Sequence, residues 1–257
     1  MLKIKRSKNY RDLLYEFVRS DFRLRYRNSV LGFIWALLKP LMTFAILYLV
    51  FGYIFGNHDP NYRLNLLLGL LIFQFFSEAT SYSTTSLIDR SSLILKANFT
   101  RSVIVAAPVI NAVINLLLSL VVFFAFWIFS PAEVTVWWLL IPMYLIILIM
   151  ISYAFGLVLS VLHAKYRDVK NIWELFLNLL FYLTPIIYPI ALVPVRFQRL
   201  VFVNPVALVI RDMRLIINSH QPASIRSFTY LLGFAVMSYI LGSLYFKRNV
   251  KSVIEKL

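Results

Sequence analysis

Residues 102–132 read SVIVAAPVINAVINLLLSLVVFFAFWIFSPA, and residues 134–162 read VTVWWLLIPMYLIILIMISYAFGLVLSVL. Only Glu133 separates the two runs, and neither contains an Asp, Glu, Lys or Arg. An α-helix rises 1.5 Å per residue, so about 20 apolar residues cross the hydrocarbon core of a bilayer. Both runs exceed that length. They are continuous rather than alternating, which favours membrane-spanning helices over the strands of a membrane barrel.

The composition of the whole chain agrees with this interpretation. Of its 257 residues, 61% are hydrophobic and 14% are charged, whereas soluble domains have about 45–50% apolar and about 25% charged residues. A soluble fold of this length could not bury so much apolar surface, but lipid tails tolerate it. The chain has no cysteine, which excludes disulfides, zinc sites with cysteine ligands and iron–sulfur clusters.

Further apolar segments extend the series of predicted spans. Three of them are free of Asp, Glu, Lys and Arg: residues 40–58, 175–195 and 227–246. A fourth run, residues 64–77, is short, but its apolar character continues past Glu78 to residue 88. We interpret residues 64–88 as a span that contains an acidic residue. The sequence therefore predicts an all-α membrane protein with six transmembrane helices.

The basic residues orient the predicted bundle. They gather in the N-terminal segment, in the loops after the second and fourth spans, and in the C-terminal tail: Lys3, Lys5, Arg6, Lys8, Arg11, Arg19, Arg23, Arg25, Arg27, Arg90, Lys96, Arg101, Lys165, Arg167, Lys170, Lys247, Arg248, Lys251 and Lys256. The loop after the first span has only Arg63, and the loop after the third has none. Because cytoplasmic loops are enriched in Lys and Arg, we expect both termini in the cytoplasm. Topology thus accounts for the net charge of +15 without a nucleic-acid partner.

We expect one transmembrane domain over residues 1–257. It comprises a cytoplasmic or interfacial N-terminal segment (1–31), the membrane bundle (32–246) and a cytoplasmic tail (247–257). Within the first segment one helical face is apolar: Tyr10, Leu13, Leu14, Phe17 and Val18. This spacing predicts an amphipathic helix. It lies in the cytoplasmic interface of the membrane or packs on another protein, and the sequence leaves both open.

The segment between the fifth and sixth spans, residues 191–226, departs from the charge rule. It places Arg196, Arg199, Arg211, Arg214 and Arg226 on the external side. A second apolar helical face follows a proline: Val206, Val209, Ile210, Met213, Ile216 and Ile217 after Pro205. We expect an interfacial or re-entrant helix pair, with residues 197–203 as its first limb. Its arginines form a cap, or four of them, Arg196, Arg199, Arg211 and Arg214, form an external gate that meets phosphate groups.

Catalytic and nucleotide-binding motifs are missing from the sequence. The seven glycines never form the phosphate-binding loop G-x-x-x-x-G-K-[ST], and the three histidines are scattered. We therefore expect no enzymatic activity, no metal and no cofactor in this chain. Ionisable residues within the predicted spans are few, namely Lys39, Glu78 and Glu174, which is too few for a proton relay.

Residues 20–41 read SDFRLRYRNSVLGFIWALLKPL. They resemble the segment leading into the first span of ABC-2 type permeases from the polysaccharide-export branch, which includes O-antigen exporters. The matching residues are Arg25, Tyr26, Ser29, Leu31, Gly32, Trp35 and Pro40, while Ser20 stands where the family has arginine. Residues 92–108 resemble the family's cytoplasmic loop without its usual proline between Phe99 and Arg101. Residues 166–169, 182–189 and 203–205 match well.

The resemblance implies a transport subunit of the bacterial inner membrane. Two copies of this chain would pair with two ATPase subunits, and ATP with Mg²⁺ would bind there and not here. The complex would export a polysaccharide linked to undecaprenyl diphosphate, with membrane lipids around it. The alternatives are export of teichoic acid, capsule, or small drugs and lipids. A scaffolding protein without transport is a third possibility, which copurification with an ATPase would exclude.

Three sets of residues are candidates for roles in such transport. Aromatic faces suit a sliding sugar chain, so we predict a translocation path along two spans: Phe44, Tyr48, Phe51, Phe55, Phe181, Tyr182 and Tyr188. We predict coupling to the ATPase at residues 89–101: Asp89, Arg90, Lys96 and Arg101. Three further arginines, Arg23, Arg25 and Arg27, are predicted to receive the pyrophosphate of the lipid carrier. For each set, plain packing or topology signalling is the competing interpretation.

Overall fold

The computed structural model describes residues 10–26, 34–54, 61–96, 99–129, 134–218 and 221–254. Within these ranges the regular elements are all helical, which confirms the predicted class. They follow in the order α1 (Tyr10–Tyr26), α2 (Ile34–Leu47), the π-helical segment η1 (Tyr48–Ile54), α3 (Tyr62–Asp89), α4 (Ser91–Lys96), α5 (Ser102–Ile128), the 3-10 turn η2 (Val136–Leu140), α6 (Ile141–Lys165), α7 (Val169–Leu183), the 3-10 turn η3 (Ile190–Leu192), α8 (Val195–Val201), α9 (Pro205–Asn218) and α10 (Ile225–Ile254).

Five helical segments within the described ranges are long and apolar enough to cross a membrane. They are Ile34–Ile54, Tyr62–Asp89, Ser102–Ile128, Val136–Lys165 and Ile225–Val253. The shortest has 21 residues, which at 1.5 Å per residue covers the roughly 30 Å hydrocarbon core. Each coincides with an apolar run of the sequence, and Glu78 lies inside a continuous helix as expected. The chain is a multi-pass membrane protein.

The predicted span at residues 175–195 has a different structure. Helix α7 begins earlier and ends at Leu183, after 15 residues, which is about 22 Å and too short to cross a bilayer alone. The helix ends because Thr184 precedes Pro185, and a residue before proline is pushed into extended backbone. Thr184 indeed has ψ of 130°. The count of six spans and the side on which the termini lie stay predictions.

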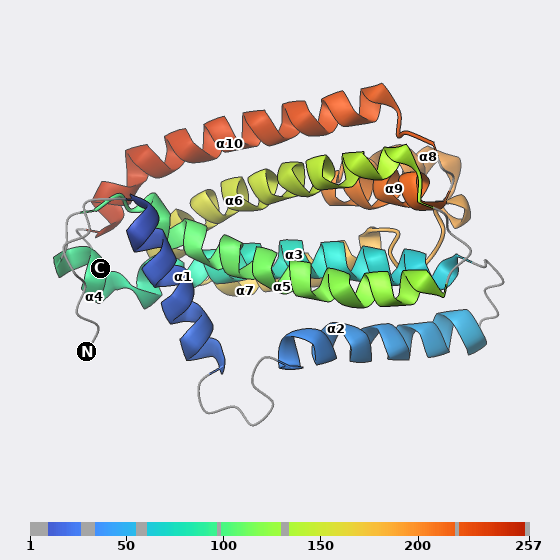
Figure 1. Ribbon diagram of the computed structural model, residues 1–257. Helices are drawn as coiled ribbons and strands as arrows, with labels where there is room; N and C mark the ends of the chain where they lie inside the picture. Colours follow the sequence, from blue (N-terminus) through green and yellow to red (C-terminus); the bar gives the residue numbers. More distant parts are fainter. Residues whose placement is uncertain are drawn as a thin grey trace.

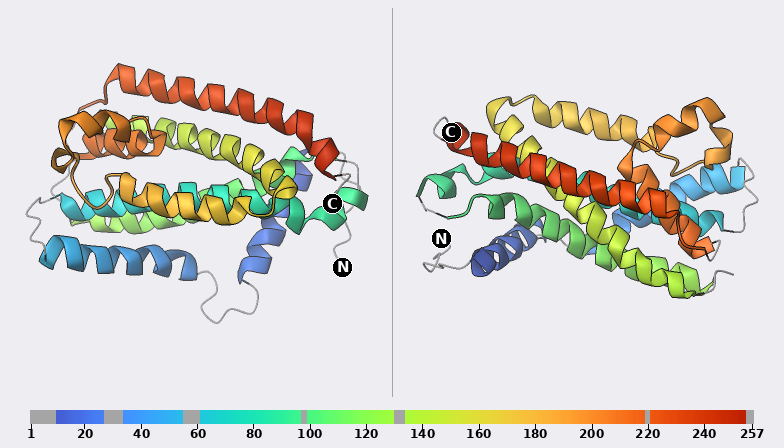
Figure 2. Two further views of the ribbon diagram at one scale, coloured as in Figure 1. Left: turned by 180° about the vertical axis from the view of Figure 1, so that it is seen from behind. Right: turned by 90° about the horizontal axis from the view of Figure 1, so that it is seen from above.

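The long helices lie side by side in layers (Figures 1 and 2). Helix α3 contacts α5 and α6, and α6 contacts α10. Helix α2 lies at one edge of the bundle against α3 and α5. Helix α7 packs on the side of α3 that is opposite to α5. Close approach of α10 to α6 depends on Gly242, because a Cβ there would lie 2.8 Å from the carbonyl oxygen of Ala154. Helix α3 is the most buried of the five long segments, and α2 is the most exposed.

Helix α1 crosses the bundle at one end (Figure 1). The predicted amphipathic helix is therefore present, and Leu13 and Phe17 of its apolar face are buried. They join a small hydrophobic cluster with Leu87 of α3, Ile104 of α5 and Val250 of α10. The face thus packs on the chain's own bundle, and its placement at a membrane interface stays a prediction.

Helices α8 and α9 lie at the opposite end of the bundle, in the segment predicted to form an interfacial or re-entrant pair. Their placement relative to a membrane stays a prediction. Helix α9 begins at Pro205, as expected, and runs alongside α6 (Figure 1). All six residues of its predicted apolar face are buried in the main core. At 14 residues it is about 21 Å long and cannot span a bilayer. It therefore enters one end of the bundle without crossing it.

Candidate functional site

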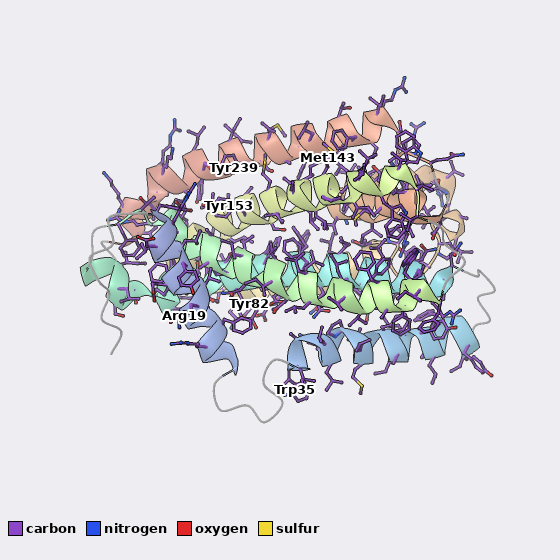
Figure 3. All side chains as sticks on the ribbon, in the orientation of Figure 1. Arg19, Trp35, Tyr82, Met143, Tyr153 and Tyr239 are labelled. Carbon is purple, nitrogen blue, oxygen red and sulfur yellow. The ribbon has the colours of Figure 1, made fainter. Side chains whose placement is uncertain are left out.

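A polar groove opens between α2, α3, α5 and α7. Its volume is about 570 Å³. The polar residues that line it are Lys39, Gln74, Ser77, Glu78, Ser81, Tyr82, Thr85, Asn115, Ser119, Lys170 and Glu174. Trp35 and Tyr82 mark its rim at the end where α1 crosses (Figure 3). The groove runs from that end to the middle of the bundle, because it takes residues from the first turns of α2 and α7 and from the middle of α5.

Helix α3 supplies most of the polar lining. Gln74, Ser77, Glu78, Ser81 and Thr85 recur every three or four residues, so they share one face of the helix. The remaining faces of α3 are largely buried; they are apolar over residues 66–73, and further along they include Thr80, Ser83, Thr84 and Ser86, whose hydroxyl groups donate to backbone carbonyl oxygens. An amphipathic helix in the centre of a membrane bundle turns its polar face away from lipid. Here that face borders an open cavity.

Glu78 lies near the middle of α3 and forms a hydrogen bond across the groove wall. The amide Nδ2 of Asn115, in the middle of α5, donates to Glu78 Oε1 over 2.6 Å. A charged residue at the centre of a bilayer costs about 3 kcal/mol on insertion scales, so such residues face a watery cavity or the bundle interior. The groove supplies both the space and the polar partners, so a hydrophilic path reaches halfway through the bundle.

The wall that α7 contributes is fixed to α3. The indole Nε1 of Trp173 donates to Thr80 Oγ1 over 3.0 Å, and the Trp173 ring packs edge-on against Phe76. On the groove side, Lys170 and Glu174 form an ion pair with 4.0 Å between their charged atoms. Because both side chains are half exposed, this pair contributes little to stability. The short helix α7 is thus held as one side of the groove.

At the opposite end of the bundle the chain leaves the helical conformation after α7, at Thr184. Arg214 of α9 donates to the carbonyl oxygens of Pro185 over 2.6 Å, Ile186 over 2.9 Å and Asn65 over 2.7 Å. The hydroxyl of Tyr62 donates to the carbonyl oxygen of Ile187 over 3.0 Å. These bonds supply donors to backbone groups that left the helix at Thr184, as a membrane environment requires. A smaller cavity of about 240 Å³ lies beside them.

The four predicted gate arginines fall into two pairs. Arg211 donates to the carboxylate of the fully buried Asp212 over 2.7 Å and to Ser227 Oγ over 2.9 Å, so it and Arg214 are engaged within the fold. Arg196 and Arg199 on α8 are exposed, and the Arg196 guanidinium lies 4.7 Å from the ring centroid of Phe197. Arg199 and Arg211 nevertheless line one further cavity of about 340 Å³ together with Arg226, and a gating role stays a prediction.

The described aromatic residues among those predicted for the translocation path lie outside the groove lining. Phe44 is buried and stacks on Tyr48, with ring centroids 5.7 Å apart. Phe181 packs edge-on against Phe73, with centroids 5.3 Å apart. Tyr182 is 68% exposed.

The remaining aromatics of that set divide in the same way. The Tyr188 hydroxyl donates to the carbonyl oxygen of Tyr182 over 2.9 Å. Phe51 packs partly buried against the main core, and Phe55 lies outside the described residues. A role of the set in translocation stays a prediction, with Tyr182 as its most exposed described member.

The residues predicted for ATPase coupling lie at the end of α3, in α4 and before α5. Arg90 forms an ion pair with Asp21 of α1, and its guanidinium lies 4.5 Å from the Phe17 ring centroid. Asp89 is exposed, and Arg101 is half buried at the start of α5. The side chain of Lys96 lies outside the described part of the chain. Arg90 therefore ties the crossing helix α1 to the corner between α3 and α4.

Of the arginines predicted to receive the carrier pyrophosphate, Arg23 is exposed on α1. Arg27 and the side chain of Arg25 lie outside the described residues. This role and the coupling role stay predictions.

Sequence reasoning singled out Glu78, Lys39 and Glu174 but missed the groove that brings them together. The missed lining residues are Gln74, Ser77, Ser81, Tyr82, Thr85, Asn115, Ser119 and Lys170. A signal was present, because uncharged polar residues recur at helical spacing through an otherwise apolar span. Its meaning depended on which helices face one another, and a single sequence does not show that.

Comparison with known proteins agrees with a membrane transport subunit. The family described as ABC-2 type transporter matches residues 13–218. The chain is 31% identical over 225 residues to the O-antigen export system permease protein RfbA of Klebsiella pneumoniae, and the match covers 87% of each chain. It is 26% identical to the protein of the same name in Myxococcus xanthus, over 82% of each chain.

A more distant relative extends the comparison. The polysialic acid transport protein KpsM of Escherichia coli is 24% identical over 234 residues, which cover 86% of this chain and 87% of the relative. The apolar helices, the resemblance at residues 20–41 and a family match over most of the chain lead to one conclusion: this chain belongs to the ABC-2 type transporter family.

Proposed function

We propose that this chain is the membrane-spanning subunit of an ABC exporter that carries polysaccharide across the bacterial cytoplasmic membrane. The relatives that it matches over most of its length are named for export of O-antigen and transport of polysialic acid. The sequence has no phosphate-binding loop, so a separate ATPase subunit supplies the energy. The polymer travels on a lipid carrier, undecaprenyl diphosphate.

The observation that carries the proposal is the polar groove. Hydroxyl groups of Ser77, Ser81 and Thr85 and the amides of Gln74 and Asn115 line it within an apolar bundle. Such groups both donate and accept hydrogen bonds, so they match the hydroxyl-rich surface of a sugar chain. Exposed rings of Trp35 and Tyr82 at the rim offer faces on which sugars stack without a fixed register.

A second copy of the chain completes the conduit in this proposal. Helices α2 and α7 each contribute lining residues to the groove. Both flanking helices present apolar side chains outward, and on α7 they share one helical stripe: Ile172, Leu175, Phe176, Leu179 and Leu183. A twofold pairing would cover these stripes and close two grooves into one path. The complex then holds two copies of this chain and two ATPase subunits.

The ATPase binds at the end of the bundle where α1 crosses. Arg90 joins α3 and α4 to Asp21 of α1 there, so movement imposed on α4 reaches the helix that carries the groove. The exposed residues Asp89 and Arg23 belong to the same end. Charge reversal at Asp89 is expected to lower substrate-stimulated ATPase activity while the complex still assembles.

Blocking the groove tests the proposed function directly. The natural chain has no cysteine, so Ser81→Cys introduces a single reactive thiol into the groove. Attachment of a bulky methanethiosulfonate reagent is expected to abolish ATP-driven export in proteoliposomes that contain the complete transporter. The matched control is Ser238→Cys on α10, outside the groove lining and equally half buried. Export that survives full modification at position 81 would contradict the proposal.

A further inference from the structure

The charge of the groove differs from that of the chain that forms it. The chain carries a net charge of +15. Among the described residues that line the groove, two are basic, Lys39 and Lys170, and two are acidic, Glu78 and Glu174. The described part of the lining is therefore neutral, within a strongly basic protein.

The four charges come from three helices. Lys39 lies in the second turn of α2, and Lys170 and Glu174 lie within the first two turns of α7. Lys170 and Glu174 form an ion pair at 4.0 Å. Glu78 lies near the middle of α3, beside Asn115 in the middle of α5. A polymer in the groove thus passes a carboxylate in the middle of the bundle.

The carboxylate of Glu78 has a fixed position. Asn115 donates to its Oε1 over 2.6 Å, and Asn115 itself is 8% exposed on α5. A side chain held by a buried partner cannot swing away from an approaching substrate. An ionised carboxylate only accepts hydrogen bonds, so it pairs with the hydroxyl groups of a sugar. Against the carboxylates of an acidic sugar it places like charges in a confined site.

We propose that Glu78 makes the groove selective for uncharged, hydroxyl-rich glycans over polyanionic ones. This inference rests on the proposed function, because it assigns the substrate class of the same groove. A path built for a polyanion is expected to carry a surplus of basic side chains, since opposite charge favours passage. The neutral lining of the described residues and the fixed carboxylate of Glu78 are the reverse of that arrangement.

The test compares two carriers of equal length in proteoliposomes that contain the full chain with its ATPase. One probe is undecaprenyl diphosphate bearing a neutral oligomannose, and the other bears an oligosialic acid. The measured quantity is the ratio of their ATP-dependent transport rates. The wild type is expected to move the neutral carrier at least about 10-fold faster than the acidic carrier. Glu78→Gln is expected to bring the ratio close to one, and Glu78→Lys to reverse it.

A matched control removes the same charge elsewhere. Glu16 is exposed on α1 and outside the groove lining, so Glu16→Gln is expected to leave the ratio unchanged. Because the readout is a ratio within one preparation, a lower yield of a variant does not alter it. Equal rates for both carriers in the wild type, or a ratio that Glu78→Gln leaves intact, would overturn the selectivity while export itself stands. Failure of the wild type to move either carrier would overturn the proposed function and this inference together.

Discussion

Arg214 and Glu78 both place a charged group within an apolar bundle, and their surroundings differ. The Arg214 guanidinium donates hydrogen bonds to backbone carbonyl oxygens of Pro185 and Ile186, in the non-helical segment after α7, and of Asn65 on α3. The Glu78 carboxylate accepts a hydrogen bond from Asn115 and borders a cavity of about 570 Å³. Ionisable residues in membrane segments are costly and therefore mark function by default. The comparison refines that rule. A charged group that is hydrogen-bonded to backbone carbonyl groups stabilises the fold, whereas a charged group beside a cavity can contact a substrate.

The largest effect is expected from Arg214→Leu. The carbonyl oxygens of Pro185 and Ile186 lose this donor in a segment that has no helix to supply another. Since a buried polar group without a partner costs about 1–3 kcal/mol, we expect a loss of about 3 kcal/mol or more in the free energy of unfolding. Unfolding by SDS in mixed micelles, followed by circular dichroism, measures it.

The matched control for this change is Arg199→Leu. Arg199 is exposed on α8, so its removal is expected to change stability by no more than about 0.5 kcal/mol. If both substitutions had the same effect, Arg214 would not be the structural tie that its contacts indicate. If Arg199→Leu instead lowered export in a stable protein, it would support the predicted gate for the exposed pair.

A smaller effect on the same region is expected from Gly69→Ala. A Cβ at position 69 would lie 2.8 Å from Arg214 Nη2 and 3.2 Å from Ile186 Cγ2. The guanidinium must shift, and its bonds to the carbonyls weaken. Overpacking of this kind costs about 1–3 kcal/mol. Thermal unfolding in detergent measures the loss.

Gly233→Ala on α10 provides the comparison for Gly69→Ala. A Cβ there meets no atom within 4 Å, and alanine favours a helix over glycine by up to about 1 kcal/mol. Opposite signs for the two substitutions are therefore expected. Equal signs would mean that helix propensity and not contact with Arg214 decides the outcome at position 69.

The same contrast explains which parts were predictable. Long uncharged runs revealed four of the five long helices, and the apolar character on both sides of Glu78 revealed α3, because length and apolar character decide whether a helix can span a membrane. The α9 face was predicted because its apolar residues recur at helical spacing after Pro205. The end of α7 was not predicted. Residues 175–195 contain no charged residue, so the sequence pattern predicts one span, but Pro185 and Pro189 interrupt the helix within that run.

The roles of the charged residues were harder to read than the helices. Sequence assigned Arg211 and Arg214 to a gate with Arg196 and Arg199, but their partners, Asp212 and the carbonyl groups after α7, appear only once α9 packs into the bundle. Aromatic stripes were chosen for the path, whereas Phe44 and Phe181 pack against other rings. The polar stripe around Glu78 was readable but unassigned, because which helices border it is a property of the tertiary fold.

At the groove beside Glu78, Asn115→Leu is expected to reduce export activity more than stability. It removes the donor that holds the Glu78 carboxylate and replaces a polar lining group with an apolar one. We expect a fall of about 10-fold in ATP-driven export, equivalent to about 1.4 kcal/mol. Export by proteoliposomes with equal amounts of assembled transporter measures it. Asn115→Gln, which retains an amide, is expected to recover part of the activity; no difference between the two variants would argue against a role for the hydrogen bond.

The smallest effect, with the opposite sign, is expected one helical turn away at Asn111. This residue is 2% exposed, and neither atom of its amide has a hydrogen-bond partner among the described residues. An unpartnered buried polar group costs about 1–3 kcal/mol, so Asn111→Leu is expected to leave stability unchanged or raise it by up to about 1 kcal/mol, with part of the gain lost to the larger side chain. SDS-induced unfolding of Asn111→Leu beside Asn115→Leu measures both in the same background. Because Asn111 lies outside the groove lining, export per assembled transporter should also stay within twofold. A clear loss of stability or export in Asn111→Leu would contradict this expectation. It would show that a hydrogen-bond partner and a place beside the groove do not decide the roles of Asn111 and Asn115.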